Sequence, residues 1–132
     1  MLNTKVIMAL SAVGMTAIAL PLIFIPDEIL AFCGIENARF HSLFLQITGA
    51  LYFAFAMLNW MAKGNPIGGI YSRPLVMSNL VHFLVGGLAL LKASMSGNYP
   101  ARIWILTAFY TVFAILFALI SFTHPKQVSK KV

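Results

Sequence analysis

The stretch 103–122, IWILTAFYTVFAILFALISF, decides the fold, because it runs for twenty residues without a charged side chain. About 20 mostly apolar residues are needed for a helix to cross a bilayer. Three further windows, 6–25, 42–62 and 75–94, are also long and apolar enough. The sequence therefore predicts an all-α integral membrane protein, a four-transmembrane-helix bundle that forms a single membrane domain over residues 1–132.

The composition agrees with a lipid environment. Hydrophobic residues make up 61% of the 132 residues and charged residues 9%, and the mean hydropathy is +0.91. Charged residues make up about a quarter of a soluble domain, so this chain lies outside that class. The formal charge of +6 suits anionic lipid headgroups. Nucleic acid is not an expected partner, because no basic stripe is interleaved with exposed aromatic residues.

The first window also has features of a signal peptide. Lys5 precedes the apolar run, and Ala17-Ile18-Ala19 has the small-x-small form of a cleavage site. The run continues to Ile25, however, which gives it a membrane-spanning length. We expect a retained helix with a kink at Pro21.

Basic residues predict the orientation. With the N-terminus inside, the cytoplasmic segments carry six basic residues and the external segments three, so the positive-inside rule places both termini in the cytoplasm of a cell (inner) membrane protein. The six are Lys5, Lys63, Arg73, Lys126, Lys130 and Lys131, and the three are Arg39, Lys92 and Arg102. In the first external loop, Pro26 and Asp27 favour a helix start and Gly34 a helix end, which predicts a short interfacial helix.

Small and polar residues recur at intervals of three or four along three of the windows, which places each set on one helical face. Such faces are expected to be packing seams between membrane helices. The sets are Ser42, Gln46, Gly49, Tyr52, Ala56, Asn59 and Lys63; Asn79, His82, Gly86, Ala89 and Ala93; and Thr107, Thr111, Ala114, Ala118 and Ser121.

The larger polar residues are candidates for a ligand site. Counted at 1.5 Å per residue, Asn59 lies about 6 Å inside Lys63, while Asn79 and His82 lie about 7 Å and 12 Å above Pro74. The three are expected to converge in the cytoplasmic half of the bundle. His82 is the intramembrane group that titrates near neutral pH. The other candidate ligand-binding residues are Lys63, Tyr71 and Arg73, which form a cationic rim suited to an anionic group, and Gln46 near the opposite surface.

Two interpretations of Asn59, Asn79 and His82 stay open: a hydrogen-bonded network that fixes helix register, or a polar pocket. Other chemistry has less support in the sequence, and no metal, cofactor or catalytic residue is predicted. The single cysteine excludes an intramolecular disulfide and a multi-cysteine metal site. The first loop contains possible ligand types without a recognised metal spacing, and the three histidines fall at different depths, so one chain cannot pair them on a haem. The loop residues are Asp27, Glu28, Cys33, Glu36 and His41, and the histidines are His41, His82 and His124.

A first helix followed by residues 26–34, PDEILAFCG, and a second helix rich in glycine and alanine together resemble the small four-helix membrane proteins of the broad DoxX-like type. The resemblance covers the chain at the level of its helix pattern. It implies the four-helix fold. That family is functionally mixed, so the resemblance transfers no catalytic residue.

The function we expect is non-enzymatic: the bundle binds or passes a small or lipidic ligand from its cytoplasmic side. Expected partners are membrane lipids, an anionic or lipidic small molecule and, through Gly86-Gly87 and the alanine-rich faces, a second copy of the chain. One alternative is an accessory subunit of a larger membrane complex. Another is a lipid-modifying enzyme, which is disfavoured because a histidine without a carboxylate or metal partner is a poor general base.

Overall fold

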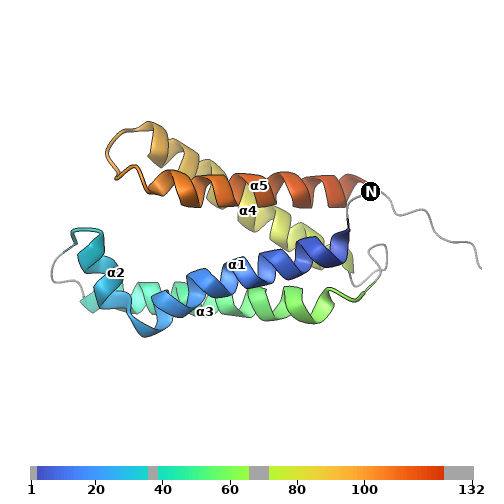
Figure 1. Cartoon of the computed structure of the whole chain (residues 1–132), viewed down its shortest axis with the longest axis horizontal. Helices are drawn as coiled ribbons and strands as arrows, with labels where there is room; N and C mark the ends of the chain where they lie inside the picture. The colour runs from blue at the N-terminus through green and yellow to red at the C-terminus, as the bar shows by residue number, and fades with distance from the viewer. Residues whose placement is uncertain (1–2, 36–38, 66–71, 124–132) are drawn as a thin grey trace, which may run out of the picture. The chain divides into compact units, whose positions relative to one another are not determined.

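The computed structural model describes residues 3–35, 39–65 and 72–123, and within them the chain forms five helices and no strand. Four of the helices are long and one is short (Figure 1). In chain order they are α1 (Thr4–Phe24), α2 (Pro26–Phe32), α3 (Arg39–Ala62), α4 (Ser72–Met95) and α5 (Ile103–Phe122).

The four long helices, α1, α3, α4 and α5, are each long and apolar enough to cross a membrane. This confirms the predicted fold class, an all-helical membrane protein with four spans and a short helix in the first loop. The helices contain the predicted windows except at Ile25, which follows the end of α1. Pro21 lies inside α1, and the helix continues past it to Phe24.

The chain divides into two compact units. One unit, Lys5–Gly64, holds α2, α3 and all of α1 except Thr4; the other holds α4 and α5. Each unit contains two of the long helices, and each is described separately below.

In the first unit, α1 and α3 pack antiparallel. Gly49 of α3 lies against α1, where an added Cβ would come within 3.1 Å of the Ala19 carbonyl oxygen and 3.0 Å of the Leu22 side chain. Ten residues further along α3, Asn59 contacts Ser11, which lies earlier in α1. Close approach at a small residue is typical of membrane helix pairs.

The short helix α2 begins at Pro26, a residue favoured in the first turn of a helix because it has no N–H to leave unbonded. Its chain turns at Gly34, whose φ of +74° favours glycine. The Ser42 hydroxyl of α3 donates a hydrogen bond to Asp27 of α2, which ties the two helices together. The predicted short helix is therefore present. Its place at the membrane surface stays a prediction.

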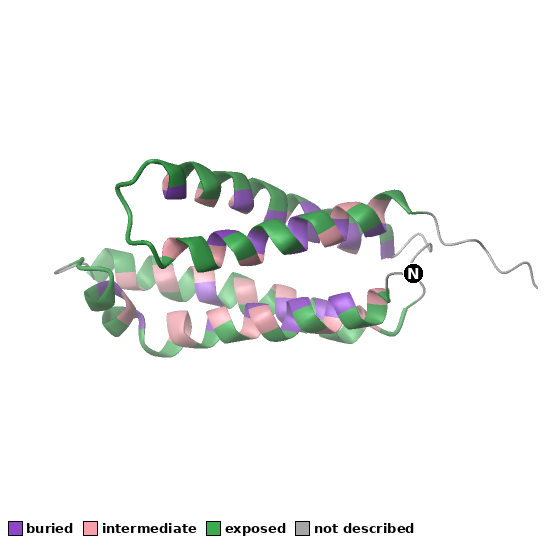
Figure 2. Ribbon diagram, turned by 45° about the horizontal axis from the view of Figure 1, so that its top comes forward, coloured by how far each residue is buried: buried purple, intermediate pink, exposed green. Residues whose placement is uncertain are grey.

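In the second unit, α4 and α5 form an antiparallel pair joined by a turn in which Gly97 has a φ of +72°. Ser94 and Thr107 hydrogen-bond at 2.7 Å near this turn. The buried positions of α5 follow one side of the helix at intervals of three residues, apart from the adjacent Phe113 and Ala114 (Figure 2). They are Thr107, Tyr110, Phe113, Ala114, Phe117 and Ile120.

Candidate functional site

His82 and Tyr110 form a polar pair within the α4–α5 unit. The Nε2 atom of His82 lies 3.2 Å from the hydroxyl oxygen of Tyr110, and their ring centroids are 5.4 Å apart. His82 is half-buried and Tyr110 is buried. Both residues lie well inside helices long enough to cross a membrane, so an ionisable ring and a phenol meet at a depth where such groups are costly.

Glycines on α4 make room for the Tyr110 ring. Gly86 lies one helical turn after His82, and a Cβ added at Gly86 would overlap the Tyr110 ring. At Gly87 an added Cβ would come no closer than 3.6 Å to Tyr110, which is an ordinary contact. Gly86 is therefore the position that allows the Tyr110 ring to approach α4 closely and reach His82.

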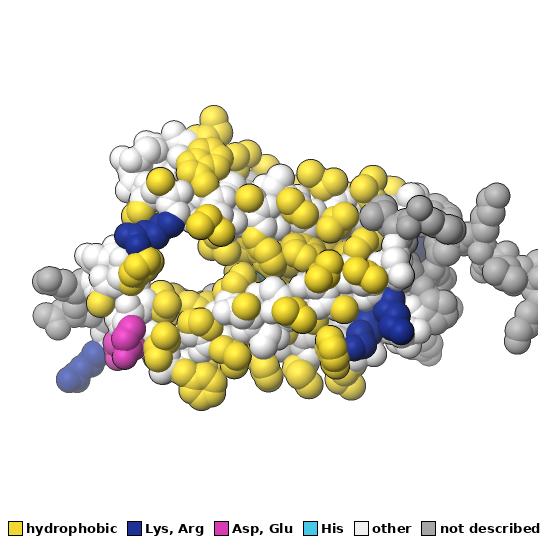
Figure 3. All heavy atoms as spheres, in the orientation of Figure 1, with side chains coloured by type: hydrophobic (Ala, Val, Ile, Leu, Met, Phe, Trp, Pro, Cys, Tyr) yellow, Lys and Arg dark blue, Asp and Glu magenta, His cyan; other side chains and the backbone are white. Residues whose placement is uncertain are grey.

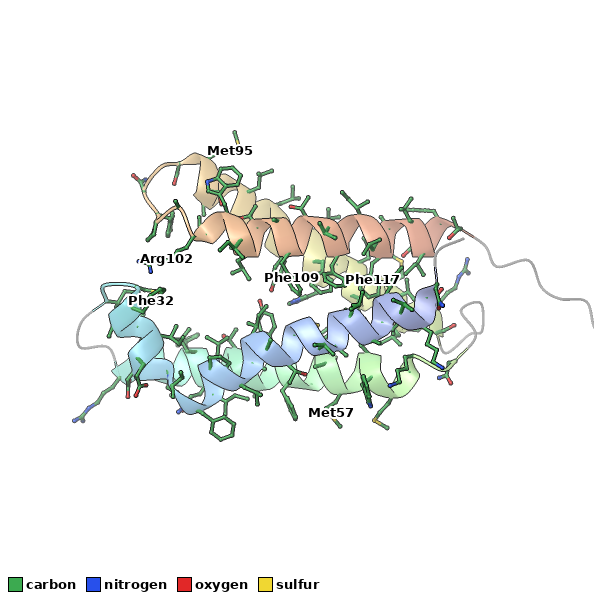
Figure 4. All side chains as sticks on the ribbon, viewed as in Figure 1. Phe32, Met57, Met95, Arg102, Phe109 and Phe117 are labelled. Atoms are coloured by element: carbon green, nitrogen blue, oxygen red, sulfur yellow. The ribbon has the colours of Figure 1, made fainter. Side chains whose placement is uncertain are left out.

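Aromatic rings pack beside this pair. Phe83 is fully buried and its ring stacks on Phe113 and Phe117, at centroid distances of 5.2 and 5.7 Å. The Phe83 and Tyr110 rings pack edge-to-face, with their centroids 5.3 Å apart. Phe109, 4.8 Å from Phe113, extends from the same side of α5 as Phe117 (Figure 4). The polar pair therefore has an aromatic flank.

Asn79 lies one turn before Phe83 on α4 and is fully buried. Its side-chain nitrogen donates a 2.9 Å hydrogen bond to the carbonyl oxygen of Leu75 in the same helix. Asn79 and His82 are three residues apart, so they share a face of α4 as predicted.

Asn59 belongs to the other unit, where it joins two helices. Its side-chain nitrogen donates to the Ser11 hydroxyl oxygen at 3.0 Å and lies 3.9 Å from the Met15 sulfur. Ser11 in turn donates to the Met8 carbonyl oxygen at 2.9 Å. Asn59 is thus part of the α1–α3 seam. Its convergence with Asn79 and His82 would join the two units and stays a prediction.

The remaining predicted site residues lie at various places on their helices. Gln46 is exposed on α3, although the helical pattern placed it on the packed face. The Lys63 Nζ atom lies 2.8 Å from the centroid of the Trp60 ring. Arg73 is exposed in the first turn of α4. Tyr71 lies outside the described residues.

The predicted stripes on α4 and α5 are partly wrong. Ala89 and Thr111 are exposed, whereas Phe83, Phe113 and Phe117 are buried. In a bilayer, hydrophobicity does not distinguish aromatic residues that face lipid from those that pack against another helix. The prediction from small and polar residues therefore did not identify the aromatic residues as part of the buried faces. Tyr110 was missed for the same reason. The available signal was the spacing of the aromatic residues, because Phe109, Phe113 and Phe117 recur every four residues and Tyr110 lies three residues before Phe113.

Among the described residues, no group of three or more His, Cys, Asp or Glu side chains could hold a metal ion. In comparisons with known proteins, the chain matches no family model, no curated protein and no solved structure at a significant level. The resemblance to DoxX-like proteins therefore rests on the helix pattern alone.

Proposed function

We propose that this membrane protein binds or passes a small or lipidic ligand, and that the His82–Tyr110 pair contacts it. The observation that carries the proposal is a half-buried histidine, hydrogen-bonded at 3.2 Å to a tyrosine, within a membrane-spanning helix. Ionisable residues inside membrane helices are rare and are concentrated at ligand, ion and proton pathways.

The chemistry of the pair indicates the kind of polar group it would take. A neutral imidazole ring offers one donor and one acceptor nitrogen, and a phenol both donates and accepts. A ligand carbonyl, hydroxyl or acidic group could therefore hydrogen-bond to either member of the pair. The half-buried ring of Phe109, which packs against Phe83, would lie beside the apolar part of such a molecule. An amphiphilic ligand meets both requirements.

Within this proposal the protein lies in a cell (inner) membrane with both termini in the cytoplasm. His82 then lies about 12 Å from Pro74 along α4, which places it in the cytoplasmic half of the span. The exposed Arg73 at the start of α4 supplies a positive charge on the route from that surface. An anionic or lipidic ligand entering from the cytoplasmic leaflet fits this arrangement.

The test is to extract the protein from its own membrane in polymer discs and identify co-purifying small molecules by mass spectrometry. We expect a molecule that is present with the wild type and lost from both His82→Phe and Tyr110→Phe. Thr107→Val is the matched control, because it removes a different hydrogen bond between α4 and α5, to Ser94. Identical molecules in wild type and both variants would contradict the proposal. Loss in the control as well would show that helix pairing, and not the His82 site, retains the molecule.

A further inference from the structure

The α1–α3 unit gathers positive charge at one end. Lys5 lies in the first turn of α1, and Lys63 directly follows α3. The hydrogen bond between Ser11 and Asn59 fixes the register of these antiparallel helices. Lys5 lies six residues, about 9 Å, beyond Ser11, and Lys63 lies four residues, about 6 Å, beyond Asn59. Both ammonium groups therefore leave the helix pair at the same end and at nearly the same level.

Trp60, at the same level, has the features of a residue at a membrane–water boundary. Its side chain is 49% exposed, and the Lys63 ammonium group lies over its ring, 2.8 Å from the centroid. Tryptophan is enriched where the hydrocarbon meets the headgroups, because its ring is apolar and its N–H is a donor. The neighbouring Met61 is 76% exposed, so the apolar surface of α3 continues up to this boundary.

The opposite end of the same unit differs in charge. It carries Asp27 and Glu28 on α2, together with Arg39 at the start of α3. Figure 3 shows only basic charged side chains at one end of the α1–α3 pair, whereas acidic side chains lie beside a basic one at the other end. Among the described residues of this unit, an anion would therefore be attracted to the end with Lys5 and Lys63.

We propose that Lys5, Trp60 and Lys63 bind the phosphate headgroup of an anionic phospholipid in the adjoining leaflet. Lysine binds phosphate as a point charge, and the indole N–H of Trp60 is a further donor. The exposed apolar side chain of Met61 lies beside the path that the acyl chains would follow. The site belongs to the α1–α3 unit and shares no residue with the His82–Tyr110 pair. This proposal is therefore independent of the proposed function, and each can be tested separately.

Trp60 is itself the reporter for the test. The Trp104→Phe background leaves Trp60 as the one tryptophan of the chain. The protein is placed in phosphatidylcholine vesicles that contain a minor fraction of either brominated phosphatidylglycerol or brominated phosphatidylcholine, and quenching of Trp60 fluorescence is measured. We expect stronger quenching by the anionic lipid. Equal quenching by the two lipids would overturn the proposal.

The lysines are then tested one at a time. A basic residue near an anionic surface contributes about 1 kcal/mol, so Lys5→Gln and Lys63→Gln should each weaken the preference for phosphatidylglycerol about fivefold. Lys5→Gln is the more telling variant, because Lys63→Gln also alters the contact with the Trp60 ring. Lys92→Gln, on α4 in the other unit, is the matched control and should leave the preference unchanged. An unchanged preference in Lys5→Gln, or an equal loss in Lys92→Gln, would overturn the proposal.

Inorganic phosphate separates a lipid site from a site for a free anion. Added to the same vesicles at constant ionic strength, inorganic phosphate should not relieve quenching by brominated phosphatidylglycerol. The lipid is also held by apolar contacts, which free phosphate cannot make. Relief of quenching by phosphate would assign the site to a soluble anion instead and overturn the proposal.

Discussion

The side-chain nitrogen of Asn59 in α3 lies 3.0 Å from the hydroxyl oxygen of Ser11 in α1, and both residues are fully buried. This bond joins two residues that are 48 positions apart in the sequence and lie on different helices. In hydrocarbon a polar side chain must find a partner, so the bond specifies how α1 and α3 pair.

A double-mutant cycle measures this bond. Asn59→Leu, Ser11→Ala and the double variant should show a coupling free energy of about 0.6 kcal/mol, the average for hydrogen bonds between membrane helices. Ser11 keeps its bond to the Met8 carbonyl oxygen when Asn59 is replaced, so no buried hydroxyl is orphaned. Unfolding by sodium dodecyl sulfate in mixed micelles gives the four free energies. Strictly additive variants would show that the two residues do not interact.

Gly86 and Gly87 provide a matched pair for testing the Tyr110 position. Gly86→Ala places a methyl group in the Tyr110 ring, and overpacking of this kind costs about 1–3 kcal/mol. Gly87→Ala meets Tyr110 at 3.6 Å and should be tolerated. Thermal unfolding in the same detergent compares them. Equal stability of the two variants would contradict the described packing of Tyr110 against α4.

Phe83→Ala should be among the most damaging single substitutions in the α4–α5 unit. It removes a fully buried ring that stacks on Phe113 and Phe117. In a water-soluble core such a change costs about 3–5 kcal/mol. We expect a smaller loss of unfolding free energy here, about 2 kcal/mol. Moving the ring from the protein interior into lipid costs less than moving it into water, so mainly the cost of the cavity remains. Phe122→Ala, at a position that is 78% exposed, should change the free energy of unfolding little; an equal loss at both sites would contradict the aromatic core.

The helices could be predicted from the sequence, whereas the faces they bury could be predicted only in part. Length and absence of charge are local properties, so 103–122 coincides with α5, and Pro26 with Gly34 marks a short helix. Gly49 and Asn59 are buried on α3 as their spacing predicts. Gln46 belongs to the same predicted stripe but is exposed. It lies near the start of α3, where headgroups or water can solvate its amide, so burial is not required. Tyr110 could not be predicted as the partner of His82, because the sequence does not show which side of α5 faces α4.

The proposed orientation can be tested with cysteine chemistry. Cys33, which directly follows α2, is exposed and lies in the loop predicted to be external, so in intact cells it should react with a membrane-impermeant maleimide. In the Cys33→Ser background, Asn98→Cys should react and Asn65→Cys should not, because the basic residues place the turn after α3 in the cytoplasm. Permeabilised cells serve as the control for access. Labelling at position 65 in intact cells, with none at position 98, would reverse the orientation.

The central claim is that the His82–Tyr110 pair contacts a ligand, and solid-state NMR tests it most directly. The protein is produced in fully ¹³C,¹⁵N-labelled cells and kept in its own membrane lipids, so that a bound molecule carries the same labels. His41→Asn and His124→Asn leave His82 as the one histidine. The proposal predicts through-space contacts from the His82 ring nitrogens to Tyr110 and to carbon atoms that belong to no amino acid, and loss of the second set in Tyr110→Phe. Contacts to protein carbons alone would contradict it and leave His82 and Tyr110 as a bond that fixes the α4–α5 pair.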